Sequence, residues 1–268
     1  MEKLARWMAR NRVLAKSLLC VGLCTCYTML LVLGVHWWIV ILIDLFMIFF
    51  SCVFVDSSAV KLQQKPLKAL SDHCDPYPLL QETAELLTCG FSGVTEQAIR
   101  INHCLALREI GQYQKSWELL SAMNIDRHAG TLPQVKFVYY CNLCDVLTLM
   151  GRYPEAEVWY QKAIQIYQDM PENKAKQSLR EAVEGMAADA WYRRGDYGQA
   201  RACISARQPE TLNNRVDQAL FYARCCIAMS EPEAARQSLE FVITYGNRLY
   251  AVVQARYLLE QMPSFDAK

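Results

Sequence analysis

Few residues of this chain have types and spacings that could support chemistry, and the first are two cysteines. Cys141 and Cys144 form a C-x-x-C pair, a spacing shared by zinc sites and redox dithiols. A zinc site needs a second cysteine or histidine pair at matching spacing, which the sequence lacks. The His-Cys neighbours at 73–74 and 103–104 do not replace it, because adjacent residues do not share a helix face. We expect these side chains to pack, with no metal bound.

The remaining ionisable residues do not form a catalytic motif. Acidic residues are dispersed, and the chain has no Gly-rich phosphate loop, nucleophile elbow or paired-acid motif. Residues 1–16 carry five basic and one acidic side chain, whereas the part after residue 55 carries 23 basic and 25 acidic ones. That nearly neutral part lacks the basic field that nucleic-acid binding needs. The sequence therefore predicts a protein that is not an enzyme, holds no cofactor and binds no nucleic acid.

The longest apolar run extends from residue 17 to residue 55 and contains one acid, Asp44, and no basic residue. As one helix it would measure about 58 Å, whereas a bilayer core is about 30 Å thick. The run is interrupted at residues 34–36, which are followed by Trp37 and Trp38, side chains that favour the membrane interface. We expect two transmembrane helices, residues 17–33 and 37–55, that form a hairpin.

Charge predicts the orientation of this hairpin. Basic residues precede the run within 1–16 and follow it at Lys61, Lys65 and Lys68, while the turn has none. Because basic flanks stay in the cytoplasm, both termini should be cytoplasmic in an integral membrane protein. Eight of the twelve cysteines lie after the run, which suits a reducing compartment. A cleaved signal peptide is disfavoured because its apolar region spans only about 7 to 15 residues.

Asp44 is the ionisable residue deepest in the apolar run. In an antiparallel hairpin that turns near residues 35–36, Tyr27 and Thr28 would lie at the same depth and could donate a hydrogen bond to its carboxyl group. Charged groups inside a membrane normally have a partner. We expect a polar contact that holds the two helices together, and the sharper alternative is a proton relay.

After the run, residues 56–75 have the polar composition and prolines of a linker, and a short helix is expected from Tyr77 to Cys89. The chain then repeats a turn. Gly111, Gly151 and Gly195 are each followed two residues later by a tyrosine and five residues later by Ser116, Ala156 or Ala200. A glycine can close a helix in the left-handed conformation, and a small side chain lets two helices approach closely.

This pattern resembles the tetratricopeptide (TPR) repeat, in which a glycine ends the first helix of a hairpin and an aromatic residue starts the second. A fourth, degenerate copy has Ser230 and Pro232 in place of the glycine and aromatic residue. Successive turns are 40, 44 and 35 residues apart, against about 34 in the family. The resemblance implies an all-α chain, with a TPR-like α-solenoid at 76–268 capped by a last helix near 248–262. HEAT-like packing is the alternative.

In TPR proteins the first helices of the hairpins build a concave binding surface. By that register we expect a groove for a protein or peptide partner, with a solvated helix face as the alternative for any one residue. The resemblance assigns to it Asn102, Arg108, Asn142, Asp145, Asp189, Tyr192 and Arg224. The lysine that carboxylate-clamping TPR proteins use at the first helix is absent, so binding of a chaperone tail is not expected.

Two functions fit these expectations. The first is a membrane-anchored scaffold that recruits a protein or peptide at the cytoplasmic membrane surface, where the anchor raises its effective concentration. The second is a structural subunit of a membrane complex, in which the hairpin packs on other transmembrane helices.

Overall fold

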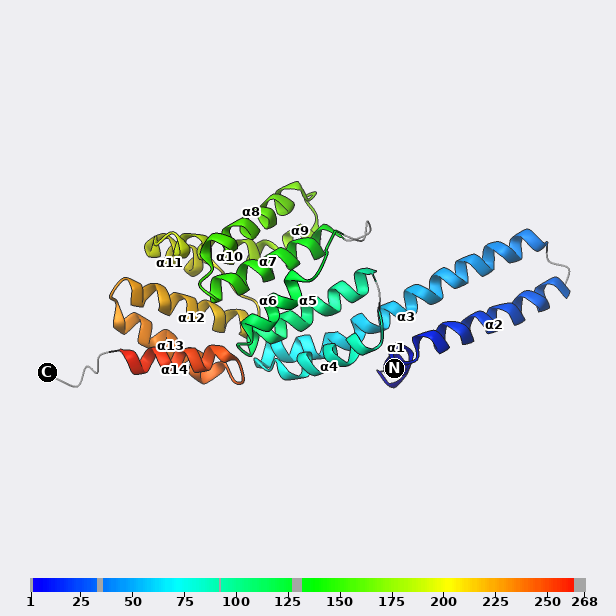
Figure 1. Cartoon of the computed structure of the whole chain (residues 1–268), viewed down its shortest axis with the longest axis horizontal. Coiled ribbons are helices and arrows are strands. Elements are labelled where there is room, and N and C mark those ends of the chain that lie inside the picture. Colours follow the sequence, from blue (N-terminus) through cyan, green and yellow to red (C-terminus); the bar gives the residue numbers. More distant parts are fainter. Residues whose placement is uncertain (1, 33–35, 92, 127–131, 263–268) are drawn as a thin grey trace.

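The computed structural model describes residues 2–32, 36–91, 93–126 and 132–262, and all the regular structure in those ranges is α-helical (Figure 1). The expected all-α fold class is confirmed. The helices are α1 (Glu2–Arg10), α2 (Arg12–Val32), α3 (Trp37–His73), α4 (Tyr77–Thr88), α5 (Gly93–Glu109), α6 (Tyr113–Ser121), α7 (Pro133–Leu149), α8 (Tyr153–Asp169), α9 (Lys174–Gln177), α10 (Arg180–Arg193), α11 (Tyr197–Ala206), α12 (Leu212–Ala228), α13 (Pro232–Tyr245) and α14 (Tyr250–Gln261).

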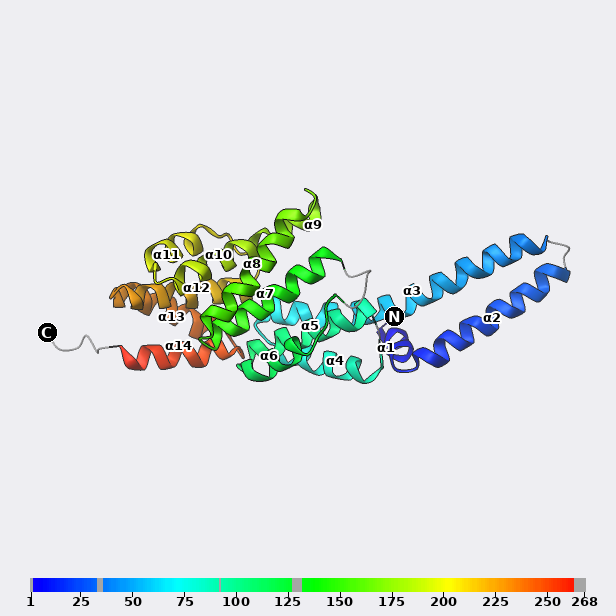
Figure 2. The same ribbon diagram turned by 45° about the horizontal axis from the view of Figure 1, so that its top comes forward.

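Helix α2 and the first half of α3 lie side by side and project away from the other helices (Figures 1 and 2). One stretch of the described residues, Val13–Leu30 in α2, is long and apolar enough to cross a membrane, with a mean hydropathy of 1.7. Only 7% of that stretch is buried inside the molecule, whereas a core helix would be mostly covered. Gly34 and Val35, where the turn between two spans was expected, lie outside the described residues.

The linker predicted at 56–75 is wrong, because α3 continues as one helix of 37 residues to His73. Lysines and Pro66 suggested a break, since proline removes one helical hydrogen bond. The burial of apolar side chains along α3 outweighs the loss of that hydrogen bond. Ala59, Leu62 and Leu70 are at most 5% exposed and lie on one face of the helix. The helix ends at Cys74, which has a φ of 52° and whose N–H donates to the Leu70 carbonyl.

The basic segment at 1–16 was expected to be a flank that sets topology, but most of it forms α1, which packs on α3. Ala9 is buried in a small core with residues of α3, α4 and α5. Arg6 bonds Glu82 at 2.9 Å and Arg10 bonds Glu85 at 2.6 Å. The N-terminal segment is therefore attached to the same body as the later helices.

Four helical hairpins follow, α5/α6, α7/α8, α10/α11 and α12/α13, and each turns in the same way. Gly111, Gly151 and Gly195 have φ values of 81°, 73° and 81°, and Ser230 takes the same left-handed conformation at 61°. After each turn the next N–H donates back to a carbonyl five residues earlier, as from Gln112 to Leu107. The small residues expected at the helix contacts are fully buried in every pair: Ser116, Ala156, Ala200 and Ala235.

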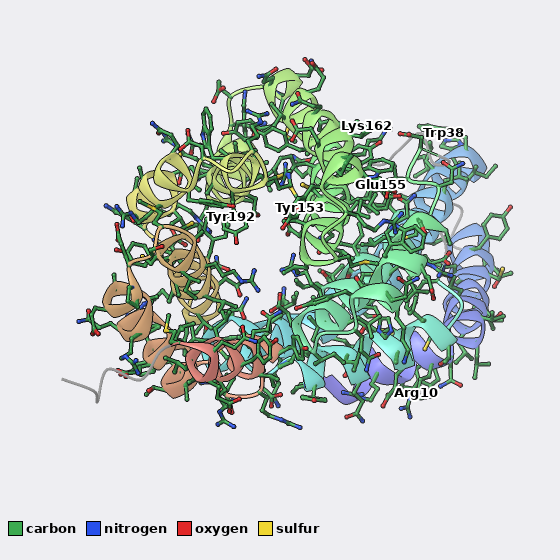
Figure 3. All side chains as sticks on the ribbon, turned by 60° about the vertical axis from the view of Figure 1, so that its left-hand side comes forward. Arg10, Trp38, Tyr153, Glu155, Lys162 and Tyr192 are labelled. Carbon is green, nitrogen blue, oxygen red and sulfur yellow. The ribbon has the colours of Figure 1, made fainter. Side chains whose placement is uncertain are left out.

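The hairpins do not form an open stack. One core cluster combines Leu70 and Ala106 from the early helices with Leu220 and Ala255 from the late ones. Viewed end on, the helices close into a ring (Figure 3). A solenoid differs, because each of its repeats contacts only its neighbours.

The ring is closed where α12 packs on α3, and α14 and the turn before it add further contacts. Arg248 pairs with Asp75 at 3.3 Å, and the Tyr250 ring lies edge-on to Tyr113, with centroids 5.9 Å apart. Gly111 lies under the Tyr250 ring, so that a Cβ at this glycine would be 2.5 Å from a ring carbon. The last helix therefore adds to the closure of the ring against the first hairpin.

Candidate functional site

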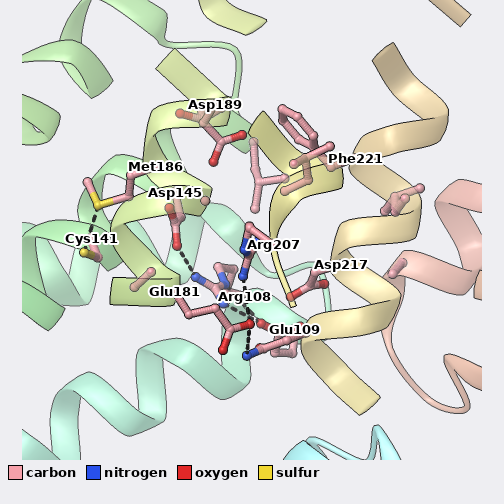
Figure 4. A pocket seen from close by; sticks show the side chains of 18 of the residues that line it. Arg108, Glu109, Cys141, Asp145, Glu181, Met186, Asp189, Arg207, Asp217 and Phe221 are labelled. Carbon is pink, nitrogen blue, oxygen red and sulfur yellow. Dashed lines mark hydrogen bonds and ion pairs between the residues drawn. The ribbon is translucent and has the colours of Figure 1, made fainter. Parts of the chain in front are cut away.

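A cavity of about 380 Å³ lies inside the ring (Figure 4). Five carboxylates and three guanidinium groups contribute to its wall. Apolar and aromatic groups fill the space between them, among them Leu149, Leu220, Phe221 and Tyr250. The charged residues are Glu109, Asp145, Glu181, Asp189, Asp217, Arg108, Arg207 and Arg224. A cavity wall with more acidic than basic groups is the main polar feature of the described interior.

Helical periodicity explains why so many polar residues meet here. On α12, Asp217 and Arg224 are seven residues apart, and on α10, Gly185 and Asp189 are four apart, so each pair lies on one face. Most of the residues that line the cavity lie on α5, α7, α10 and α12, which are the first helices of the four hairpins. Arg207 is different, since it follows α11 at the end of that helix.

Arg108 forms the centre of one ion-pair group. Its Nη1 is 2.5 Å from Asp145 Oδ2 and its Nη2 is 2.7 Å from Glu109 Oε1. Burial works against the charge of Arg108, but Glu109 and then Asp145 raise the pKa of its guanidinium overall. Burial raises the pKa of Asp145, and Arg108 partly offsets this effect. The three side chains connect α5 to α7.

A second group joins α10 to the segments around α12. Arg207 Nη2 donates to Glu181 Oε1 at 3.0 Å, and Asn214 Nδ2 donates to the same oxygen at 2.9 Å. Gly185 permits this approach, because a Cβ there would be 3.1 Å from Arg207 Nη1. The buried Nε of Arg207 has no hydrogen-bond acceptor among the described residues.

A third group closes the ring at α14. Arg224 Nη2 donates to Gln254 Oε1 at 2.9 Å, and Gln254 Nε2 donates to the Tyr113 hydroxyl at 3.1 Å. Burial raises the pKa of Tyr113 to about 12, so the phenol stays neutral. All three arginines of the cavity are thus hydrogen-bonded to groups of the wall.

Asp189 and Asp217 differ from the other acids of the cavity, because no hydrogen bond or ion pair of either carboxylate is found within the described part of the chain. Burial and the charge of Asp145 raise the pKa of Asp189 to about 7. Burial and the charge of Glu109 raise the pKa of Asp217 to about 7. Both side chains are partly exposed, so the cavity is open to solvent beside them.

Four of the residues predicted for the groove line this cavity, namely Arg108, Asp145, Asp189 and Arg224. The other three have different surroundings.

Asn102 donates to Gln63 of α3 at 2.8 Å. Asn142 is 6% exposed and donates to the Val138 carbonyl, so it lies in the core of its own helix pair. Tyr192 packs against the rings of Tyr197 and Phe221, behind the cavity wall.

The sequence reasoning missed several residues of the wall. Asp217 carried a signal, because it lies two helical turns before the predicted Arg224. Arg207, Tyr250 and Gln254 carried none, since the end of α11 brings in the first and helix α14 brings in the other two.

The cysteines singled out by their spacing are packed, whereas of the two histidines His103 is partly buried and His73 is exposed. Cys141 and Cys144 are at most 8% exposed, and burial raises the thiol pKa of each. The Cys141 thiol is 3.0 Å from Met186 Sδ (Figure 4). His103 Nδ1 is 2.9 Å from the Thr83 hydroxyl, and burial lowers the pKa of its imidazole. No group of three potential metal ligands occurs among the residues that the structure describes.

The polar contact predicted in the apolar run stays a prediction. The side chain of Asp44 lies outside the described residues, although its backbone is part of α3. Thr28 donates its hydroxyl to the Thr25 carbonyl at 2.9 Å within α2, and Tyr27 is partly exposed.

Comparisons with known proteins return no matching family model, no matching curated protein and no matching solved structure.

Proposed function

We propose that the protein is a membrane-anchored, TPR-like scaffold, whose ring of helical hairpins binds a protein or peptide partner at the cytoplasmic membrane surface. The observation that carries the proposal is the charged cavity inside the ring. Four of the residues assigned to the groove by the resemblance line it. No catalytic role is proposed for them, because ion pairs and hydrogen bonds within the wall engage the arginines.

The proposed anchor is a hairpin of α2 and the apolar half of α3, with both chain ends in the cytoplasm. Large apolar side chains of α2 face outward, with Val21 65% exposed and Met29 70% exposed. Such a surface is unfavourable in water, where burying apolar area gains about 25 cal/mol per Å². The basic residues at both ends of the hairpin favour this orientation.

Site-specific photo-crosslinking in cells tests the scaffold. A photoreactive phenylalanine analogue replaces Phe221, which lines the cavity, or Tyr245, which is 49% exposed on α13 and lies outside the cavity. The scaffold predicts a discrete crosslinked protein from position 221 and none from position 245. Equal crosslinks from both positions, or none from position 221, contradict the proposal.

The second candidate, a structural subunit of a membrane complex, rests on the exposed apolar face of α2. It predicts that the same analogue at Leu18, which is 54% exposed, crosslinks to another membrane protein while position 221 stays unreacted.

A further inference from the structure

Some charged groups of the cavity wall pair with a group of opposite charge, and others do not. Arg108 pairs with Glu109 and Asp145, and Arg207 pairs with Glu181. With Arg224 bonded to Gln254, no arginine of the wall is hydrogen-bonded to Asp189 or Asp217. Above about pH 7, where Asp189 and Asp217 are ionised, five carboxylates against three guanidinium groups leave the wall with an excess of negative charge. The cavity therefore favours a cation over an anion.

Asp189 and Asp217 reach the cavity from two helices, α10 and α12, and Figure 4 shows both side chains directed into it. Each is partly exposed, so water and solutes reach its carboxylate. The wall also carries the Phe221 ring and the Leu220 side chain. This combination suits a positively charged group at the end of an aliphatic stem, which is the form of an arginine or lysine side chain.

The volume of the cavity and a second polar group without a hydrogen-bond partner indicate a ligand larger than a metal ion. The volume of about 380 Å³ falls in the range of about 300 to 1,000 Å³ typical of organic-ligand sites. Arg207 Nε, a donor of the same wall, also has no acceptor among the described residues, and Arg207 is 11% exposed at its side chain. A peptide has partners for both kinds of group, because its basic side chains can pair with the carboxylates and its carbonyl oxygens can accept from Arg207 Nε.

We propose that the cavity is a site for a basic side chain of the peptide partner, and that Asp189 and Asp217 receive its guanidinium or ammonium group. The inference rests on the scaffold function proposed above and names the chemistry of its ligand. A bound cation would offset the repulsion of Asp189 by Asp145 and of Asp217 by Glu109, which Arg193, Arg207 and Arg108 only partly balance.

The test is isothermal titration calorimetry on the full-length protein in detergent micelles at pH 8. The probe is the tripeptide acetyl-Gly-Arg-Gly-amide. Its counterpart with citrulline in place of arginine keeps the shape but removes the charge. Butylguanidine, a free guanidinium compound without a peptide backbone, distinguishes a small cation from a peptide side chain.

The variant is Asp189→Asn with Asp217→Asn, which keeps the side-chain shape. Its matched control is Glu118→Gln with Asp169→Asn, which removes two carboxylates from exposed positions outside the cavity. Charged hydrogen bonds predict binding at least about tenfold tighter for the arginine peptide than for the citrulline peptide. The cavity variant should lose that preference and the control should keep it. Both variants should keep their helicity, measured by circular dichroism.

Equal binding of the two peptides, an unchanged preference in the cavity variant, or a Kd weaker than about 10 mM for the arginine peptide would overturn the inference. Butylguanidine binding as tightly as the tripeptide would keep the cation site but overturn the peptide as its source. If the photo-crosslink at position 221 persists in the cavity variant, the basic-side-chain site is wrong while the scaffold stands. If that crosslink is absent from the wild type, the scaffold fails too.

Discussion

The N-terminal helices and the ring expose opposite chemistry. On α2, apolar side chains such as Val21 and Met29 face outward and little of the helix is covered. In the ring, charged side chains such as Asp189 and Asp217 face inward around a cavity. Each arrangement is costly for an isolated molecule in water, because apolar surface stays hydrated in one case and charges are partly desolvated in the other.

These two unfavourable arrangements indicate what the protein needs from its surroundings. An outward apolar surface is stabilised by an apolar environment, and inward carboxylates are stabilised by a cation. The two regions are connected through α3, whose first half lies beside α2 and whose second half lies in the core of the ring. A rigid helix therefore links the proposed anchor to the proposed binding site.

The largest expected effect concerns α2. Changing Leu18 and Val21 to lysine places two charges near the middle of the apolar stretch Val13–Leu30. Insertion scales give about 2.5 to 3.5 kcal/mol for each charge at the centre of a span. The variant should leave the membrane fraction, measured by alkaline extraction and sedimentation. Val253→Lys, at an apolar position that is 55% exposed on α14, is the control and should stay in the membrane. Retention of the double variant would refute the anchor.

The closure of the ring is tested by two glycines with similar backbones. Gly111 and Gly151 have φ values of 81° and 73°, so alanine strains both turns by about 1 to 2 kcal/mol. At Gly111 the new methyl group also meets the Tyr250 ring, whereas the space at Gly151 is open. Gly111→Ala should therefore lower the free energy of unfolding by about 1 to 3 kcal/mol more than Gly151→Ala, measured by urea denaturation. Equal losses would mean that α14 does not close on the first hairpin.

Within the cavity, paired and unpaired acids should respond differently. Asp145→Ala removes one partner of Arg108 and should lower the free energy of unfolding by about 1 to 3 kcal/mol. Asp189→Asn removes a charge without a hydrogen-bonded partner and should leave stability unchanged or higher. Thermal denaturation of the two variants measures the difference. A larger loss for Asp189→Asn would show that its carboxylate has a stabilising partner.

Stability should also depend on pH. The pKa of Asp189 and of Asp217 is raised from 3.8 to about 7 in the folded protein. Their contribution to stability is therefore fully present below about pH 4 and is lost as the pH rises through 7. Between pH 5 and pH 8 the melting temperature of the wild type should fall more than that of the Asp189→Asn, Asp217→Asn variant. Parallel melting curves across this range would contradict the raised pKa values.

The sequence alone was sufficient for the local structure of the hairpins. A glycine before a tyrosine and a small residue three positions later encode a left-handed helix end and a close helix contact, and both are properties of adjacent residues. The turns at Gly111, Gly151 and Gly195 and the buried Ala156 and Ala200 follow that logic. Even Ser230 adopts the glycine conformation, because the hydrogen bond from Glu231 to the Cys226 carbonyl completes the same turn.

Predictions from local sequence patterns were less reliable where contacts with residues distant in the sequence decided the structure. Pro66 and the lysines around it are typical of a linker, but α3 stays helical because Leu62 and Leu70 are buried against other helices. Asn102 and Asn142 have the register of a groove, yet one bonds α3 and the other lies in the core. A helical register predicts which face a residue lies on, but not which neighbour covers that face.

The same distinction between local pattern and tertiary contact applies to the candidate site. The sequence determined that α5, α7, α10 and α12 carry polar residues at intervals of whole turns, which is why Arg108, Asp145, Asp189 and Arg224 meet in the cavity. Only the tertiary structure decided that α14 folds back onto the first hairpin and that Arg207 pairs with Glu181. The physical reason is that helical periodicity depends on neighbours within about one turn, whereas ring closure depends on the small rotations between successive hairpins added over the whole chain.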